Sequence, residues 1–277
     1  MGSVKKSFDL TDKITVITGG AGMLGEKHAE AIAEFGGIPI LLDIDKEAGT
    51  QIASRIAHEY QVDCELKLCD ITDESQISSV RDSLLSKFGR IDILINNAAT
   101  DPKVEEKGGK NNLSRLENFP LVQWNIELAV GLTGAMLCSK IFGKEMSKNG
   151  QGVILNISSD LGLIAPDQRL YKKEGFPENE QPVKPVTYSV IKHGLIGLTR
   201  YLATYWADKG VRVNSISPGG IYNNQNPEFV QKLTNLIPLG RMAHEDEYKA
   251  VVIFLVSDAS SYMTGANLVM DGGRTCW

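Results

Sequence analysis

Short apolar runs rich in β-branched residues alternate along the chain with longer stretches that carry apolar residues at helical spacing. Strands that alternate with helices form a parallel sheet with helices on both faces. The pattern therefore predicts an α/β fold with a single doubly wound, Rossmann-type parallel sheet of about seven strands. The predicted strands are 14–18, 38–42, 64–69, 91–95, 152–157, 211–216 and 267–270, and the predicted helices include 46–60, 74–88, 121–146, 187–209 and 245–256.

Three polar stretches interrupt this alternation. Residues 100–119 and 165–186 are long inserts that carry cations and hydrogen-bonding groups, and loops of such length are usually functional or disordered. Residues 222–238 are rich in asparagine and are expected to form a mobile loop. The strand at 64–69 alternates apolar and polar residues, which predicts a position at the sheet edge. The whole chain, 1–277, is interpreted as one domain with two inserts.

The first predicted strand ends in a glycine cluster at 19–25, and a helix, a second strand and Asp43 follow. This order is that of the dinucleotide-binding unit. Glycines let the backbone approach a pyrophosphate, and a helix N-terminus favours its negative charge. Asp43 would accept the adenosine ribose hydroxyls and repel a 2′-phosphate, which favours NAD over NADP. The alternative is a plain tight turn with Asp43 as a helix N-cap, although Asp45 is the better placed cap.

Tyr188 and Lys192 lie four residues apart at the start of a predicted helix, so both face the same side. A phenol titrates near ~10 in water. A lysine ammonium one turn away favours the phenolate and lowers that pKa, so Tyr188 is a candidate acid/base at neutral pH. The pattern is weak alone, because Tyr205 and Lys209 repeat it. That second copy precedes Gly210 at a helix end, where lysine and glycine suit a structural role.

Six chemically useful residues follow the ends of six different predicted strands. The carboxyl ends of parallel strands lie along one rim of a sheet, and ligands bind beyond that rim. Each residue also has a simpler interpretation: Asp70 and Asn97 suit turns, and Ser159 suits a turn cap. Their common position is the main argument for a site there. The six are Gly19, Asp43, Asp70, Asn97, Ser159 and Gly219.

Composition narrows the functional classes. The chain has 277 residues, of which 42% are hydrophobic and 23% charged, as in soluble globular proteins. The net charge of −5 disfavours nonspecific nucleic-acid binding. No apolar run was judged long enough to span a bilayer, and residues 1–13 lack the apolar core of a signal peptide. The four cysteines show neither metal spacing nor a disulfide framework, which favours a reducing cytoplasm and no metal site.

Taken in order over 10–273, the motifs resemble those of the classical short-chain dehydrogenase/reductase family. The resemblance implies an NAD-dependent oxidoreductase with Ser159, Tyr188 and Lys192 as catalytic residues. It also implies that the backbone of Ile221 meets the nicotinamide carboxamide. The motifs are Thr18-Gly19-Gly20-Ala21-Gly22-Met23-Leu24-Gly25, Cys69-Asp70-Ile71-Thr72, Asn96-Asn97-Ala98-Ala99, Asn156-Ile157-Ser158-Ser159, Tyr188-x-x-x-Lys192, Ser217-Pro218-Gly219 and Asp271-Gly272-Gly273. The implied cofactor-binding residues are Gly19, Gly22, Met23, Leu24, Gly25, Asp43, Asp70, Ile71, Asn97, Ala98, Tyr188, Lys192, Pro218, Gly219 and Ile221.

The chain departs from the family pattern in four places. Met23 stands at the third glycine position, with Gly22 one place early. Gly131 stands where many members have an asparagine that organises a proton relay, and Asn125 lies about 600° around the helix from it. The gap between Ser159 and Tyr188 is lengthened by the 165–186 insert. In a further departure, the family's threonine near the cofactor phosphates is replaced by Asn223.

The inserts favour a polar substrate, sugar-like and either neutral or anionic, over a steroid or acyl chain. The alternative is that their cations are solvated surface. The pattern is also similar to members linked to bacterial surface-sugar or flagellin-glycan synthesis. Two further readings are an NAD-binding regulatory or structural homologue without turnover and, less favoured, an extended-type epimerase. The resemblance implies a homotetramer or homodimer, with the interface expected at Leu195, Leu198, Leu202 and the C-terminal Trp277.

Overall fold

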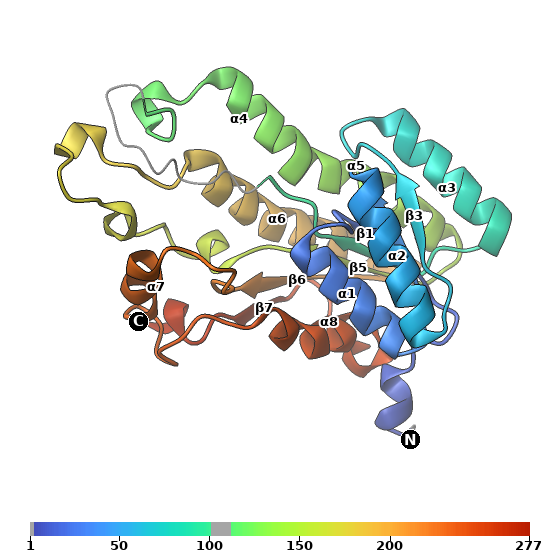
Figure 1. Cartoon of the computed structure of the whole chain (residues 1–277). Coiled ribbons are helices and arrows are strands. Elements are labelled where there is room, and N and C mark those ends of the chain that lie inside the picture. Colours follow the sequence, from blue (N-terminus) through green and yellow to red (C-terminus); the bar gives the residue numbers. More distant parts are fainter. Residues whose placement is uncertain (1–2, 101–111) are drawn as a thin grey trace.

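The computed structural model describes residues 3–100 and 112–277. Within them, seven strands form one parallel sheet in the order β3-β2-β1-β4-β5-β6-β7 (Figure 1). The chain crosses from β3 back over β1 to β4, so the strand order reverses between β1 and β4, which is where ligands bind in such sheets. The predicted α/β class and strand number are confirmed. The strands are β1 Ile14–Thr18, β2 Ile38–Asp43, β3 Glu65–Leu68, β4 Ile93–Asn96, β5 Gly152–Ile157, β6 Val211–Pro218 and β7 Asn267–Met270.

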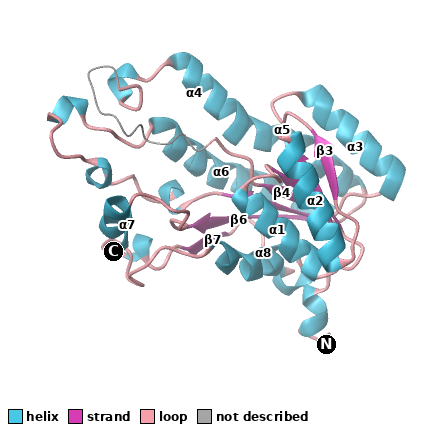
Figure 2. Cartoon of the chain, in the orientation of Figure 1, coloured by secondary structure: helices cyan, strands magenta, loops and turns pink. Residues whose placement is uncertain are grey.

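Helices cover both faces of the sheet (Figure 2). One apolar cluster joins the sheet to α3, α5 and α6, and a second joins it to α1, α2 and α8. Successive residues of β1 serve different clusters, since Val16 packs in the first and Ile17 in the second, and both are fully buried. The helices are α1 Met23–Glu34, α2 Lys46–Tyr60, α3 Glu74–Phe88, α4 Leu121–Leu128, α5 Gly134–Lys148, α6 Val186–Tyr205, α7 Pro227–Thr234 and α8 Lys249–Val256.

Local signals account for several helix starts. Asp45 accepts a hydrogen bond from the Ala48 amide at 3.0 Å, so it is the N-cap of α2, as expected. Asp73 caps α3 by accepting from the Ser75 amide at 2.8 Å. The alternating strand β3 lies at the sheet edge, which confirms that prediction.

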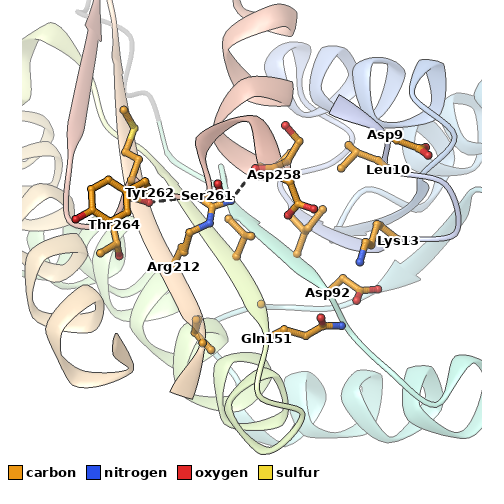
Figure 3. Close-up of a pocket in the computed structure, with 18 of the residues that line it drawn as sticks. Asp9, Leu10, Lys13, Asp92, Gln151, Arg212, Asp258, Ser261, Tyr262 and Thr264 are labelled. Carbon is orange, nitrogen blue, oxygen red and sulfur yellow. Dashed lines mark hydrogen bonds between the residues drawn. The ribbon is translucent and has the colours of Figure 1, made fainter. Parts of the chain in front are cut away.

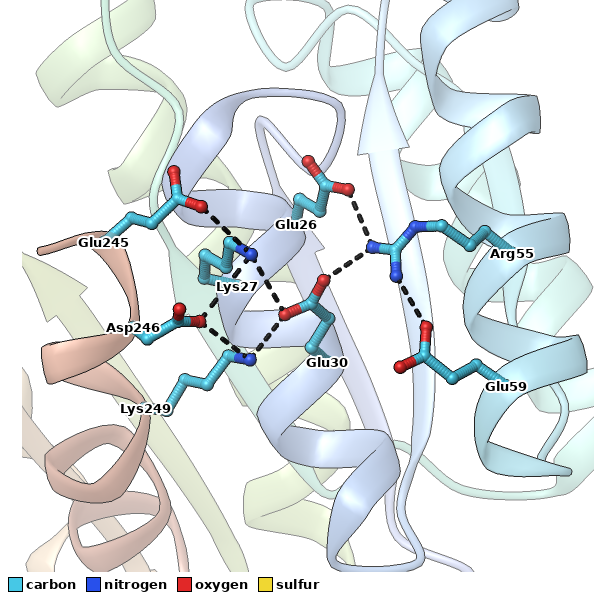
Figure 4. A network of polar contacts seen from close by, with 8 residues as sticks. All are labelled: Glu26, Lys27, Glu30, Arg55, Glu59, Glu245, Asp246 and Lys249. Carbon is cyan, nitrogen blue, oxygen red and sulfur yellow. Dashed lines mark hydrogen bonds and ion pairs between the residues drawn. The ribbon is translucent and has the colours of Figure 1, made fainter. Parts of the chain in front are cut away.

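An ion-pair network joins α1 to the helices on either side of it (Figure 4). Glu30 of α1 is 5% exposed and contacts Arg55 of α2 at 2.6 Å and Lys249 of α8 at 2.5 Å. Burial raises the pKa of Glu30, but hydrogen bonds from Lys249 and Arg55 outweigh burial and hold that pKa below its ordinary value of 4.5. The network therefore holds the glycine-turn helix in place through charge as well as packing.

The long predicted helix at 121–146 is divided. A π-helical turn, Ala129–Thr133, separates α4 from α5, and Gly131 lies in it. A Cβ on Gly131 would lie 2.8 Å from Ile191 Cγ2, so α6 occupies the space that an asparagine side chain would need. Asn125 is exposed, which agrees with its expected position away from the site.

Length and composition alone would let Leu121–Lys148 pass as a membrane-spanning helix, with a mean hydropathy of 1.4. No run of this kind is predicted from the sequence. The hydropathy is that of an 18-residue stretch of this helix, and half of that stretch is buried inside the protein. Cys138 and Phe142 of the same helix are fully buried in the core. A core helix of a globular domain is buried in this way, and cysteine and phenylalanine are among the residue types most often fully buried.

Two other expectations were wrong. The 222–238 segment is not a continuous loop, because α7 lies within it; Asn226 caps this helix and Pro227 occupies its first position. The leucines assigned to a subunit interface belong to this chain's own core: Leu195 and Leu202 are 3% and 7% exposed, and Leu198 packs against them. An apolar stripe on a helix fits either role. Here Leu195 packs against Ala135 of α5, and Leu202 packs in the cluster that includes the sheet.

Candidate active site

The glycine turn is closely packed against its own backbone. A Cβ on Gly25 would lie 2.1 Å from the carbonyl oxygen of Gly19, and Gly19 itself has a φ of +64°. Helix α1 begins at Met23, with Gly22 as an N-cap that has no side chain to occupy the helix N-terminus. The shifted glycine thus leaves the helix N-terminus without a side-chain cap, an arrangement that suits a pyrophosphate.

Side chains at the ends of β2 and β4, the two strands that flank β1, hydrogen-bond this turn. Asp43 at the end of β2 accepts from the Ala21 amide at 2.9 Å. Asn97, just after β4, donates through Nδ2 to the carbonyl oxygens of Thr18 and Gly19, both at 3.1 Å. The Thr18 hydroxyl accepts from the amides of Asn97 and Ala98 at 3.0 Å. Asp43 and Asn97 therefore have structural roles at the place where sequence reasoning expected a cofactor.

The other cofactor candidates lie along the same rim. Asp70 accepts from the Thr72 amide and hydroxyl, so it does form the turn that was its simpler interpretation. Ile71 beside it is buried, and a Cβ on Gly134 would lie 2.7 Å from it. Pro218 ends β6, a Cβ on Gly219 would lie 2.7 Å from Asp271 Cα, and Ile221 bridges to Ala243. Asn223, the replacement near the expected phosphates, is exposed.

Lys192 joins α6 to the end of β5. Its Nζ donates to the carbonyl oxygen of Ile157 at 2.8 Å, and its own carbonyl accepts from the Ser158 hydroxyl at 2.8 Å. Lys192 is buried, and its Nζ lies 5.6 Å from the centre of the half-buried Tyr188 ring. Ser159 is the next residue along from this junction. The structure thus brings the three predicted catalytic residues to one corner of the rim.

A second ammonium approaches the same ring. Lys184 Nζ, from the 165–186 insert, lies 4.1 Å from the centre of the Tyr188 ring. By contrast, Tyr205 of the second Tyr-x-x-x-Lys copy is 60% exposed and stacks on Tyr201 with ring centres 5.7 Å apart. The two copies are therefore in different environments, and only Tyr188 has ammonium groups beside it near the rim.

Sequence reasoning missed two buried carboxylates at this corner. Asp160 accepts from the Ser159 hydroxyl at 2.8 Å and forms an ion pair of 2.6 Å with Arg274. Glu127 of α4, 1% exposed, accepts a hydrogen bond from the hydroxyl of Thr187, the residue before Tyr188. The position of Asp160 directly after the serine motif could have marked it as a candidate. Its partner Arg274 could not have been found in this way, because it lies 114 residues away.

The described parts of the two inserts pack on each other. Arg115 donates to the carbonyl oxygens of Glu178 and Gln181 at 3.1 and 3.3 Å, and the Ser114 hydroxyl accepts from the Val183 amide at 3.3 Å. The buried Gln181 side chain bonds the main chain of Lys173, which orders the second insert. Lys103, Lys107 and Lys110 lie outside the described residues.

Acids neutralise several of the insert cations. Arg169 pairs with Asp167 at 2.7 Å, and Lys172 pairs with Glu178 at 2.7 Å. Arg115 lies 3.4 Å from Glu117. These pairs favour the interpretation in which the cations belong to the loop structure.

A cavity of about 580 Å³ lies at the amino ends of the strands, on the rim opposite the candidate residues (Figure 3). Its lining includes Lys13, Asp92, Arg212 and Asp258 and none of the candidate residues. The Arg212 guanidinium already donates to the carbonyl oxygens of Leu255, Met263 and Ser257 at 2.8–3.3 Å. Its donors serve the fold, so the candidate site remains at the carboxyl rim.

Comparison with known proteins agrees with this architecture. A family model described as short chain dehydrogenase matches residues 13–171, and a second, described as Enoyl-(Acyl carrier protein) reductase, matches residues 178–275. The chain is 32% identical to a D-threitol dehydrogenase from Mycolicibacterium smegmatis, covering 99% of this chain and 96% of that one. It is 33% identical to an NAD-dependent glycerol dehydrogenase from Listeria innocua, covering 98% and 96%.

A solved structure of a short-chain type dehydrogenase/reductase from Mycobacterium marinum superposes with a TM-score of 0.84, at 30% identity and full coverage of both chains. Cofactor use varies among the relatives, since a mannitol dehydrogenase from Alternaria alternata, 31% identical over 98% of this chain and 95% of its own, is named NADP-dependent. The chain belongs to the short-chain dehydrogenase family and is an oxidoreductase of that class. Members of this class use a nicotinamide cofactor.

Proposed function

We propose that this protein is an NAD-dependent dehydrogenase that interconverts a secondary alcohol and a ketone on a small, neutral, polyol-type substrate. The observation that carries the proposal is the junction at Lys192. Its two 2.8 Å hydrogen bonds, with Ile157 and Ser158, join the helix that carries Tyr188 to the strand end that leads into Ser159. The similarity to threitol and glycerol dehydrogenases supports a polyol. The neutralised insert cations support an uncharged substrate.

Each residue has a defined part in the proposed reaction. The nicotinamide supplies the hydride acceptor or donor. Tyr188 takes the proton from the reacting hydroxyl or returns it to the carbonyl. Lys192 and Lys184 place positive charge beside the phenol ring, which favours the phenolate. Ser159 hydrogen-bonds the substrate.

The glycine turn fits the pyrophosphate of a dinucleotide, because Gly19, Gly22 and Gly25 keep side chains away from the α1 N-terminus. Asp43 supports NAD. Each of its carboxylate oxygens already accepts one amide hydrogen, and each keeps a lone pair for a ribose hydroxyl. A 2′-phosphate would be repelled by this charge. Asp43→Ser should therefore lower kcat/KM with NAD at least about tenfold relative to NADP, a change of about 1.4 kcal/mol. A wild-type preference for NADPH would contradict the assignment.

The direct test is NADH formation across a panel of neutral polyols, their phosphates and acyclic secondary alcohols. Turnover should be highest with a four- to six-carbon polyol, and the phosphate esters should be poorer. Turnover of none of them would favour the alternative, an NAD-binding regulatory or structural homologue. Preference for the phosphates would contradict the neutral-substrate part of the proposal alone.

We further propose that residues 1–277 act as one domain in the cytoplasm and associate as a homotetramer or homodimer. Support for association comes from apolar side chains exposed on α4, where Leu121 and Val122 are 72% and 66% exposed, and from Trp277 at 77%. Light scattering tests this part, and a monomer would contradict it. The link to surface-sugar synthesis stays a prediction.

A further inference from the structure

A short segment, residues 242–246, joins the two halves of the proposed cofactor site. The glycine turn stands at the end of β1, whereas Ile221 stands shortly after β6, beside the strand whose end leads into Ser159. A dinucleotide must contact both halves, because its pyrophosphate lies at the turn and its reacting ring lies beside the candidate catalytic residues. The spacing between the halves therefore bears on cofactor binding.

At one end, the segment pairs with the main chain that follows β6. Ala243 forms a parallel bridge with Ile221. Its amide donates to the Gly220 carbonyl oxygen at 3.0 Å, and its own carbonyl oxygen accepts from the Tyr222 amide at 2.9 Å. The segment thus extends the edge of β6 by one paired residue, on the side of the molecule where the nicotinamide is expected.

At the other end, the segment is held to α1. Lys27 Nζ lies 3.1 Å from Glu245 and 3.6 Å from Asp246 (Figure 4). The Lys27 side chain is 17% exposed, and burial alone would lower its pKa, but bonds with Glu245 and Glu30 hold that pKa above its ordinary value of 10.5. The ammonium therefore stays charged and paired at neutral pH.

The turn between the two ends is closed by hydrogen bonds of its own. Glu247 accepts from the His244 amide at 2.8 Å and binds Arg241 through two hydrogen bonds of 2.6 and 2.7 Å. A bidentate pair between arginine and a carboxylate fixes the geometry of both partners. The acids that contact α1 therefore keep a fixed position relative to the bridge at Ala243.

We propose that residues 242–246 are a brace that fixes the spacing between the glycine turn and the nicotinamide half of the site, and that Lys27 is the positioning residue that holds this brace to α1. The inference rests on the proposed function, in which NAD occupies both halves. A brace formed before the cofactor arrives removes the ordering cost that NAD would otherwise pay at the second half. ADP, which carries only the adenosine and the two phosphates, gains nothing from the brace.

The test compares the dissociation constants of NAD and ADP, measured by isothermal titration calorimetry at one ionic strength. Lys27→Met should weaken NAD binding at least about fivefold and leave ADP binding within about twofold. Lys27→Arg keeps the charge and should keep the wild-type ratio of the two constants. Glu245→Gln combined with Asp246→Asn removes the same contacts from the other side and should change the ratio as Lys27→Met does.

Arg55→Met is the matched control. Arg55 belongs to the same ion-pair network, but it pairs with acids of α1 and α2 at 2.6–2.8 Å, on the side of Glu30 away from the brace (Figure 4). The variant should lower stability and leave the ratio of the NAD and ADP constants unchanged. Glu245 and Asp246 are 42% and 60% exposed, so their double variant keeps the fold even where Lys27→Met does not.

The outcomes are distinct. An unchanged ratio in Lys27→Met and in the Glu245/Asp246 variant would overturn the inference and leave the proposed function standing. An equal change of the ratio in Arg55→Met or in Lys27→Arg would also overturn it, because neither variant removes the charge that holds the brace. Wild-type protein that binds neither NAD nor ADP would overturn the proposed function itself.

Discussion

The proposed cofactor corner of the rim, around the glycine turn, and the proposed substrate corner, around Ser159, are built differently. At the proposed cofactor corner, main-chain groups of the glycine turn are bonded by Asp43, the last residue of β2, and by Asn97, the residue after β4. At the substrate corner, Ser159 depends on Asp160 and, through it, on Arg274 near the end of the chain. The first corner is built from main-chain groups at adjacent strand ends, whereas the second depends on one pair of charged side chains 114 residues apart.

This difference has a consequence for specificity. The glycine turn tolerates little change, because backbone meets backbone at its centre. The substrate corner is held by side chains whose replacement leaves the strands in place, so its selectivity can change while the cofactor corner stays intact. The same fold can thus keep one cofactor and take different polar alcohols.

The largest expected effect lies in the glycine turn. Gly25→Ala places a Cβ 2.1 Å from the Gly19 carbonyl oxygen and should lower the free energy of unfolding by about 3 kcal/mol or more. Gly22→Ala is the matched control: its φ of −83° suits alanine and its new Cβ has 3.4 Å of space, so the loss should stay below about 1 kcal/mol. Urea unfolding without cofactor measures both. Equal stability of the two variants would contradict the packing argument.

A smaller effect is expected at the base of the substrate corner, where Glu127 and Thr187 link α4 to the first turn of α6. A charge-assisted hydrogen bond in a buried site should give a coupling free energy of about 1–2 kcal/mol. The measurement is a double-mutant cycle with Glu127→Leu and Thr187→Val, followed by urea unfolding. The single variants should also reduce kcat while cofactor binding is kept, because Tyr188 follows Thr187. Strict additivity of the two substitutions would show that the pair carries no coupling.

A pH-dependent effect of similar size concerns the acid stability of helix α1. Burial lowers the pKa of His28 on α1 to about 4 from 6.5. The unfolded chain therefore binds a proton that the folded chain does not, and stability falls as the pH drops below 6.5. From pH 7 to pH 5 the loss from this group should be about 2 kcal/mol. Denaturant unfolding at several pH values measures this loss.

A His28→Leu variant should lack this fall in stability between pH 7 and pH 5.

The Glu30 network acts in a different pH range. Because the folded pKa of Glu30 is lowered, its stabilisation is present above pH 4.5 and is lost only as the pH falls through the folded pKa. Lys249→Met should therefore change the acid dependence only below that point. A pH 5–7 slope that survives in His28→Leu would contradict the assignment to histidine.

The same contrast explains what could be predicted from the sequence. Strand runs and the glycine cluster have strict local stereochemistry, so the sheet, its order of elements and the position of the turn at Gly19 were predictable. The partner of Asp160 was not, since an arginine 114 residues away has no local mark. Apolar periodicity also cannot separate core from interface, which is why Leu195 was misassigned. The helix at 227–234 was missed although Asn226-Pro227 is a recognisable helix start.

The central claim is that the Tyr188 phenol, and not its sequence twin, exchanges the proton of the substrate. The most direct measurement compares Tyr188→Phe with Tyr205→Phe in NADH formation from the best polyol, with cofactor binding followed by fluorescence. Tyr188→Phe should lose at least about a hundredfold in kcat and still bind NAD, because removing a general acid/base costs about 10²–10⁴-fold. Tyr205→Phe should keep wild-type turnover. Activity retained in Tyr188→Phe would contradict the claim.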